Sequence, residues 1–261
     1  MGSYAEINIP QGQLAGRVAL VTGGSSGFGH AISSVFAAQG ARVYIGDMNP
    51  DGAQKLAAQY PEGNVIARAM NVTKREDWNA ALKEILETWG KLDILINNAG
   101  TSYKNKPTVD VTEDEYKRCF DVNCFGIFHS VAVVFPEFVK QKSGICVNIS
   151  SCGASRPRQG LVWYNASKGA VSNATKGLAL EFGPHQIRVN SICPLLTGTG
   201  LFESFAGVPD TPENRQKFLS NVPLGRLGEV DDVANATLFL CTDAAKFITG
   251  VNLDVDGGRT I

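Results

Sequence analysis

The stretch "WYNASKGA", residues 163–170, places Tyr164 and Lys168 four positions apart. Two helical residues at this spacing lie on one face with their Cβ atoms about 5–6 Å apart, so an ammonium can sit beside a phenol. A free phenol has a pKa of about 10, and a nearby positive charge lowers that pKa toward a value useful for proton transfer. The same pair also fits a solvated helix face, so alone it leaves both interpretations open.

Ser151 strengthens the chemical interpretation of the pair. It ends the apolar run "GICVNISS" (144–151), a short distance before Tyr164. Chance supplies all three residues at these spacings with a probability of roughly 0.02, so coincidence explains the arrangement poorly.

A glycine-rich loop, "TGGSSGFG" (22–29), follows an apolar run near the start of the chain. Its glycines permit a tight turn and a close backbone approach to a pyrophosphate, and the N-terminus of a following helix favours phosphate charge. Asp47 ends the next apolar run, where an acidic side chain can bind the ribose hydroxyls of adenosine. Taken alone, the loop also fits an ordinary turn, and Asp47 also fits a residue of a surface turn. Together they favour a dinucleotide-binding site.

The elements that position these residues alternate regularly along the chain. Apolar runs predict strands at 17–23, 41–47, 64–71, 92–100, 144–151, 187–193 and 250–256. Helical patterns occupy 29–40, 51–60, 75–90, 112–142, 161–182 and 229–241. Strands rich in Val and Ile on both faces indicate an α/β fold, in which a parallel sheet lies between two layers of helices. Ligands of such sheets bind beyond the carboxyl ends of the strands.

Composition limits the partners and the compartment. Of 261 residues 44% are hydrophobic and 19% charged, with a net charge of −1, which gives no reason to expect a nucleic acid or an anionic membrane as partner. The six cysteines are dispersed and the three histidines scattered, so we expect reduced thiols and no metal site. Residues 1–16 lack the pattern of a signal peptide, and no apolar run approaches a membrane span. We expect a soluble cytoplasmic protein with an N-terminal arm, 1–16, and one domain, 17–261.

The motifs together resemble those of the classical short-chain dehydrogenase/reductases over essentially residues 15–261. They are, in order, "TGGSSGFG", Asp47, "NNAG" (97–100), Asn123, Ser151 and "YNASK" (164–168). The resemblance implies a Rossmann-type, doubly wound sheet and hydride transfer between a nicotinamide and a carbonyl or secondary alcohol. It also implies the roles of four catalytic residues. Tyr164 is the general acid/base, Ser151 binds the substrate oxygen, Lys168 lowers the pKa of Tyr164 and holds ribose hydroxyls, and Asn123 binds a water that relays protons.

The resemblance further implies a cofactor-binding set at the strand ends. Its members are Gly23, Ser25, Ser26, Gly27, Phe28, Gly29, Asp47, Asn71, Val72, Asn98, Ala99, Gly100, Tyr164, Lys168, Pro194, Thr197 and Thr199. Asp47 would repel a 2′-phosphate, and "DMNPDG" after it holds no Lys or Arg, so NAD(H) is predicted. Three residues depart from the family pattern. Asn71 stands where the family often has an Asp that contacts the adenine, and we expect the Asn71 amide still to accept a hydrogen bond there. Phe28 replaces the usual Ile of the glycine loop. Leu195 replaces a Gly, so the sequence does not determine the backbone conformation at that position.

Substrate information is thinner. Ser151, Trp163, Leu195, Phe202 and Phe205 are the candidate substrate contacts, and 195–220 is long enough to form a lid. These aromatics favour an apolar or cyclic substrate, while Arg156 and Arg158 are expected to be solvated loop charges that could instead meet an acid group.

Two other functions and the assembly remain open from the sequence. One alternative is a catalytically silent nucleotide-binding regulator, which the intact catalytic residues disfavour. Another is an epimerase or dehydratase, whose relatives usually carry a larger C-terminal domain. The resemblance implies a homotetramer, or a homodimer, through the helix of Tyr164, where small residues permit close approach of a partner.

Overall fold

A seven-stranded parallel sheet forms the centre of the computed structural model, which describes residues 12–197 and 202–261. The strand order is β3-β2-β1-β4-β5-β6-β7. The strands are β1 (Val18–Thr22), β2 (Arg42–Asp47), β3 (Val65–Ala69), β4 (Ile94–Asn97), β5 (Gly144–Ile149), β6 (Ile187–Pro194) and β7 (Asn252–Val255). The chain reverses direction across the sheet between β1 and β4, which is the switch point where doubly wound sheets bind ligands. The predicted fold class is confirmed.

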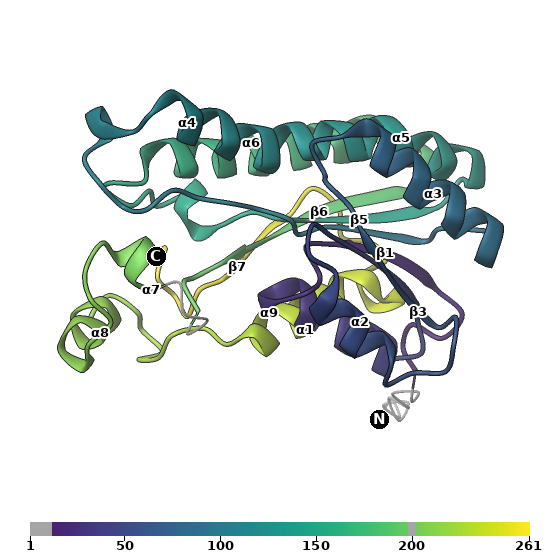
Figure 1. Cartoon of the computed structure of the whole chain (residues 1–261), viewed down its shortest axis with the longest axis horizontal. Coiled ribbons are helices and arrows are strands. Elements are labelled where there is room, and N and C mark those ends of the chain that lie inside the picture. Colours follow the sequence, from purple (N-terminus) through teal and green to yellow (C-terminus); the bar gives the residue numbers. More distant parts are fainter. Residues whose placement is uncertain (1–11, 198–201) are drawn as a thin grey trace, which may run out of the picture.

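Helices cover both faces of the sheet in three layers (Figure 1). One layer consists of α3 (Arg75–Trp89), α4 (Glu113–Phe120), α5 (Gly126–Gln141) and α6 (Val162–Phe182). The other consists of α1 (Gly27–Ala38), α2 (Asp51–Ala57) and α9 (Val230–Cys241). Each predicted strand and helix is present, with ends that differ by a few residues.

The sheet is buried on both faces because successive strand side chains point in opposite directions. In β1, Ala19 and Val21 belong to the core under α1 and α9, whereas Val18 and Leu20 belong to the core under α3 and α5. All four side chains are almost fully buried. This double burial explains why the strands are continuous apolar runs in the sequence.

The helix predicted over 112–142 is interrupted by one π-helical turn, Asp121–Phe125, between α4 and α5. Thr112 caps the start of α4 in a capping box with Glu115. By length and composition alone the stretch Glu113–Gln141 is apolar enough to cross a membrane. Its apolar residues have another explanation, because Val134, Phe135 and Phe138 are buried in the core against the sheet.

Two segments bear on the domain boundaries expected from the sequence. Residues 12–16 pack on the domain: Leu14 is 1% exposed and its N–H donates to the Gln39 carbonyl at 3.0 Å. The last residues of the expected arm, 12–16, thus lie on the domain, and residues 1–11 lie outside the described part. The segment expected as a lid contains two helices that the sequence pattern missed, α7 (Phe202–Ala206) and α8 (Pro212–Leu219), which lie beside the C-terminus (Figure 1).

Candidate active site

A cavity of about 870 Å³ lies at the carboxyl ends of the central strands. It is lined from the glycine loop, the ends of β2, β4, β5 and β6, helices α4 and α6, and Phe205 and Phe218 of α7 and α8. Ser151 and Tyr164 line one part of it, and Asp47 and Asn71 another. The cavity thus joins the predicted catalytic residues to the predicted adenosine-binding residues.

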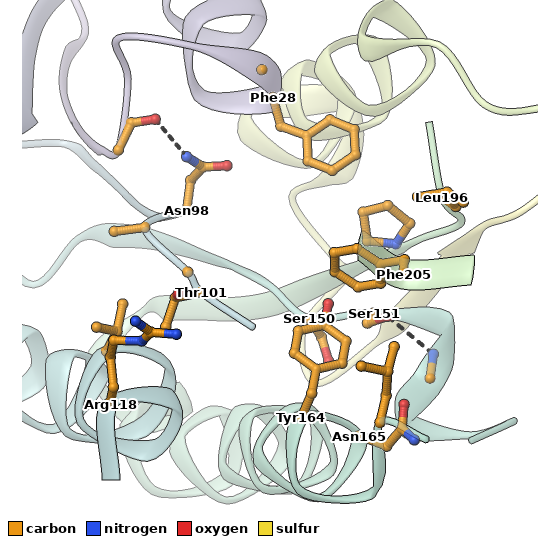
Figure 2. Close-up of a pocket in the computed structure, with 18 of the residues that line it drawn as sticks. Phe28, Asn98, Thr101, Arg118, Ser150, Ser151, Tyr164, Asn165, Leu196 and Phe205 are labelled. Atoms are coloured by element: carbon orange, nitrogen blue, oxygen red, sulfur yellow. Dashed lines mark hydrogen bonds between the residues drawn. The ribbon is translucent and has the colours of Figure 1, made fainter. Parts of the chain in front are cut away.

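Tyr164 projects from the first turn of α6 into this cavity, next to Phe205 (Figure 2). The two rings meet edge to face, with centroids 5.2 Å apart. The N–H of Trp163 donates to the Tyr103 hydroxyl at 2.9 Å, and this bond holds the start of α6 in place. A general acid/base needs such fixed geometry toward the atom with which it exchanges a proton.

Ser151 lies where β5 ends, and its hydroxyl is already oriented. Its Oγ accepts the Gly153 N–H at 3.1 Å, as drawn in Figure 2. A serine hydroxyl that accepts one bond still has its own proton to donate. Ser151 is therefore a donor for an oxygen bound beside Tyr164.

Lys168 is one turn beyond Tyr164 and is 5% exposed. Its Nζ donates to the Ile149 carbonyl at 2.8 Å and lies 6.0 Å from the centre of the Tyr164 ring. The ammonium is thus anchored to the end of β5, and it does not line the cavity wall itself.

Burial shifts the pKa values of this pair in opposite directions. Desolvation raises the pKa of Tyr164 above its ordinary value, and the Ser151 hydroxyl opposes that rise in part. Desolvation lowers the pKa of Lys168 to about 8. The Lys168 ammonium is turned to the Ile149 carbonyl, and its role in lowering the pKa of Tyr164 stays a prediction.

Asn123 sits in the π-helical turn, a feature that often marks functional sites. Its Oδ1 accepts the Thr101 N–H at 2.8 Å, and its Nδ2 donates to the Thr101 carbonyl and to Ser167 Oγ, each at 2.9 Å. A Cβ on Gly100 would lie 3.3 Å from both Asn123 Oδ1 and Lys168 Nζ, so both polar atoms lie close to Gly100. The proton-relay role of Asn123 stays a prediction.

The glycine loop has the shape of a phosphate cradle. A Cβ on Gly29 would come within 2.2 Å of the Gly23 carbonyl, whereas a Cβ on Gly27, at a positive φ of 54°, would meet nothing within 4 Å. Gly27 therefore leaves open space beside the N-terminus of α1, where backbone N–H groups favour an anion. The buried Ser25 Oγ has no hydrogen-bond partner in the structure. These features fit a dinucleotide pyrophosphate.

Asp47 is held against this loop by two backbone donors. Its Oδ2 accepts the Ser25 N–H and its Oδ1 the Asn49 N–H, both at 3.0 Å. Each carboxylate oxygen keeps a further lone pair, and the side chain lines the cavity, so Asp47 can accept ribose hydroxyls.

Asn71 lines the cavity, and its amide oxygen is engaged locally. This oxygen accepts both the N–H and the hydroxyl of Thr73, at 3.0 and 2.8 Å. Its contact with adenine stays a prediction. Asn98, which lines the cavity below Phe28 (Figure 2), donates to the Thr22 and Gly23 carbonyls at 2.8 and 2.9 Å and so ties β4 to the loop.

Most of the predicted site residues line the one cavity, and several do not. Those that line it are Gly23, Ser26, Gly27, Phe28, Asp47, Asn71, Val72, Asn98, Ala99, Gly100, Ser151, Tyr164, Pro194, Leu195, Thr197 and Phe205. Ser25, Gly29, Asn123 and Lys168 lie behind its wall. Thr199 lies outside the described residues.

Two predicted substrate contacts point elsewhere. Trp163 packs edge-on against Tyr116 on the outside of α6, and Phe202 is buried against Phe218 beneath the cavity wall. Leu195 causes no strain, because Lys142 and Gln186 are the only described residues other than glycine with a positive φ.

Three residues that support or line the site were missed or misjudged from the sequence. Tyr103 is a lone aromatic in a loop, and nothing in the sequence signals its bond to α6. Asn165 Nδ2 donates to the Arg158 carbonyl at 2.8 Å, and its place beside Tyr164 in the motif was the available signal. Arg158 is not a solvated loop charge: it is half-buried and lines the cavity. Arg156 is exposed and also lines the cavity.

Comparison with known proteins gives matches over nearly the whole chain. A family model described as enoyl-(acyl carrier protein) reductase matches residues 23–260. The 4-formylbenzenesulfonate dehydrogenase TsaC1/TsaC2 of Comamonas testosteroni is 45% identical over 94% of this chain and 98% of its own. The 2,5-dichloro-2,5-cyclohexadiene-1,4-diol dehydrogenase LinX of Sphingobium indicum is 38% identical over 95% of this chain and 98% of its own. The crystal structure of a 3-ketoacyl-(acyl-carrier-protein) reductase from Brucella melitensis complexed with NADH superposes with a TM-score of 0.89 at 40% identity, covering 95% of this chain and all of the other.

Proposed function

Because the chain belongs to the short-chain dehydrogenase/reductase family, we propose that it is an NAD-dependent enzyme that interconverts cyclic ketones and secondary alcohols. The family membership makes it an oxidoreductase that transfers hydride with a nicotinamide cofactor. The observation that carries the proposal is one cavity that joins Ser151 and Tyr164 to the glycine loop and Asp47. No comparison favours a silent regulator.

The chain's own residues divide the reaction between them. The glycine loop and the N-terminus of α1 bind the pyrophosphate, Asp47 the adenosine ribose, and Lys168 the nicotinamide ribose. A nicotinamide held by these residues would supply the hydride for ketone reduction and would accept it in alcohol oxidation. Ser151 donates a hydrogen bond to the substrate oxygen, and Tyr164 gives that oxygen a proton from its hydroxyl. Burial keeps Tyr164 protonated, which suits it to act as the acid in ketone reduction.

A cyclic substrate is supported by the wall around Tyr164. Phe205, Leu195 and Leu196 line the cavity there, and their apolar surface suits a ring. Two of the similar proteins are named for ring compounds, a benzenesulfonate and a cyclohexadiene diol. We also propose that the enzyme works dissolved in the cytoplasm, since the one helix apolar enough for a membrane within residues 12–197 and 202–261 covers the sheet.

NAD(H) rather than NADP(H) is expected because Asp47 is fixed in place at the ribose position. A 2′-phosphate there would face a carboxylate held by two backbone donors. We expect kcat/KM with a cyclic ketone to be at least about 10-fold higher for NADH than for NADPH, since like charges at close range repel. Initial rates of the wild type with both cofactors measure this, and an NADPH preference would contradict both the cofactor and the role of Asp47.

The double variant Asp47→Ala, Met48→Arg tests the role of Asp47 by reversing the charge offered to the adenosine ribose. Met48 lines the cavity and is 75% exposed, so an arginine there can reach a 2′-phosphate. The ratio of kcat/KM values should shift toward NADPH. Asp51→Ala removes an exposed carboxylate of α2 that does not line the cavity and should leave the ratio unchanged.

We propose a homotetramer for the assembly, with α5 and α6 at one interface. Small residues on the outer face of α6, Ala166, Ala170 and Gly177, are exposed, and so are Phe125 and Phe128 on the neighbouring helix. A symmetric partner would cover this surface. Light scattering should give about four times the 27.9 kDa chain mass; a monomer at every concentration would refute the proposal.

A further inference from the structure

Arg118, Arg156, Arg158 and Arg259 line the cavity with Ser151 and Tyr164, and none of them is used by the hydride transfer. Arg158 lies on the loop between β5 and α6, and Arg259 comes from the C-terminus, which ends beside α7 (Figure 1). Arg158 Nη2 has one weak contact, to the Ala206 carbonyl at 3.4 Å, and Arg259 Nη1 is buried without any hydrogen-bond partner. Neither forms an ion pair with a described carboxylate.

The two charges are close enough to repel each other. Desolvation lowers the pKa of Arg158, and the charge of Arg259 lowers it further. Of the acidic groups nearby, Asp256 accepts the N–H groups of Gly258 and Thr260 at 2.9 and 2.8 Å. Asp254 contacts the Thr260 hydroxyl. Holding two partly buried like charges near each other without an ion-paired carboxylate is unfavourable, and a bound anion would reduce that cost.

The side chain of Arg158 and the backbone of Arg259 are held in place by neighbouring residues. The Arg158 guanidinium stacks on Phe218, 5.0 Å from the ring centre, and its carbonyl is bound by Asn165, the residue next to Tyr164. Arg156 donates to the Arg259 carbonyl, and two glycines with positive φ, Gly257 and Gly258, turn the chain so that Arg259 reaches the cavity. A preorganised guanidinium binds a carboxylate or sulfonate with paired hydrogen bonds.

Resting on the function proposed above, we infer that Arg158 and Arg259 form a subsite for an anionic substituent of the substrate, so that the enzyme acts on ring ketones or alcohols that carry a carboxylate or sulfonate. The anion lies at the arginines while the carbonyl lies between Ser151 and Tyr164. The pyrophosphate of the cofactor has its own cradle in the glycine loop and does not need these arginines.

A matched pair of substrates tests the subsite. We expect the wild type to reduce 4-oxocyclohexanecarboxylate with a higher kcat/KM than its neutral methyl ester. In Arg158→Met the ratio of the two kcat/KM values should fall about 10- to 100-fold, as the loss of charge-assisted hydrogen bonds implies. Arg259→Met should lower the same ratio and serves as the second variant if Arg158→Met does not fold.

Arg42→Met is the charge-matched control, because Arg42 is exposed at the opposite end of β2. The ratio should not change in that variant. The inference is overturned if the wild type shows no preference for the anion, if the ratio survives loss of either arginine, or if the variants instead weaken NADH binding, which would assign the arginines to the cofactor.

Failure of the proposed function gives a different result. If neither substrate is reduced with NADH, the function is wrong, and the anion site is then judged by calorimetric titration of cyclohexanecarboxylate into the protein. Binding that Arg158→Met abolishes and Arg42→Met retains supports the subsite. No binding to the wild type contradicts it.

Discussion

Tyr164→Phe is expected to lower kcat by a factor on the order of 10²–10⁴, which is the usual contribution of a general acid or base. The variant removes one hydroxyl and leaves the ring, its edge contact with Phe205 and the start of α6 unchanged. NADH affinity, measured by the quench of protein fluorescence, should therefore stay close to that of the wild type. Steady-state reduction of a cyclic ketone measures kcat.

Tyr116→Phe is the matched control for this variant. Tyr116 is a partly exposed tyrosine of α4 that does not line the cavity, so the same loss of a hydroxyl should leave kcat unchanged. Near-normal turnover in Tyr164→Phe would exclude Tyr164 as the proton donor.

Lys168→Met is expected to have a comparable effect on kcat and, unlike Tyr164→Phe, to weaken NADH binding. The buried ammonium is anchored to the end of β5 beside Gly100, close to where the nicotinamide ribose must lie. Its removal takes away both a ribose donor and the positive charge nearest the Tyr164 ring. Steady-state kinetics and a direct NADH titration separate the two effects.

The pH dependence distinguishes this role from a purely structural one. The pKa of Lys168 is lowered to about 8, so the group is charged below that pH and loses its proton as the pH rises through it. The value of kcat/KM for NADH, which reports groups of the free enzyme, should fall in that range for the wild type. The fall should be absent in Lys168→Met and present in Lys176→Met, whose lysine is exposed on the same helix. Unchanged NADH affinity in Lys168→Met would exclude the ribose role.

The sheet, its flanking helices and the cluster of motif residues were predictable because they follow from local patterns. Strands buried on both faces are continuous apolar runs, and the carboxyl ends of parallel strands share one edge, so Asp47 and Ser151 had to meet the same crevice. The pairing of Tyr164 with Lys168 follows from helical spacing alone.

The remaining features depend on packing between distant segments. At the π-helical turn, Asn123 forms side-chain bonds to Thr101 and Ser167, which no periodicity in the sequence reveals. The burial of Phe202 and the outward position of Trp163 follow from how α7 and α6 dock, and a single sequence does not report that. Arg259 reaches the cavity only because the last turn of the chain folds back.

The most direct test of hydride transfer at this site uses NADH that carries deuterium at C4, in each of its two stereochemical forms. Wild-type enzyme is incubated with each form and a panel of cyclic ketones, and the alcohol is examined by mass spectrometry. With one of the two forms, we predict that the wild type produces alcohol with one deuterium on the carbinol carbon. In the same time, Tyr164→Phe should produce less of this labelled alcohol by a factor on the order of 10² or more. Alcohol that carries no deuterium from either form, or no alcohol at all, would contradict the account.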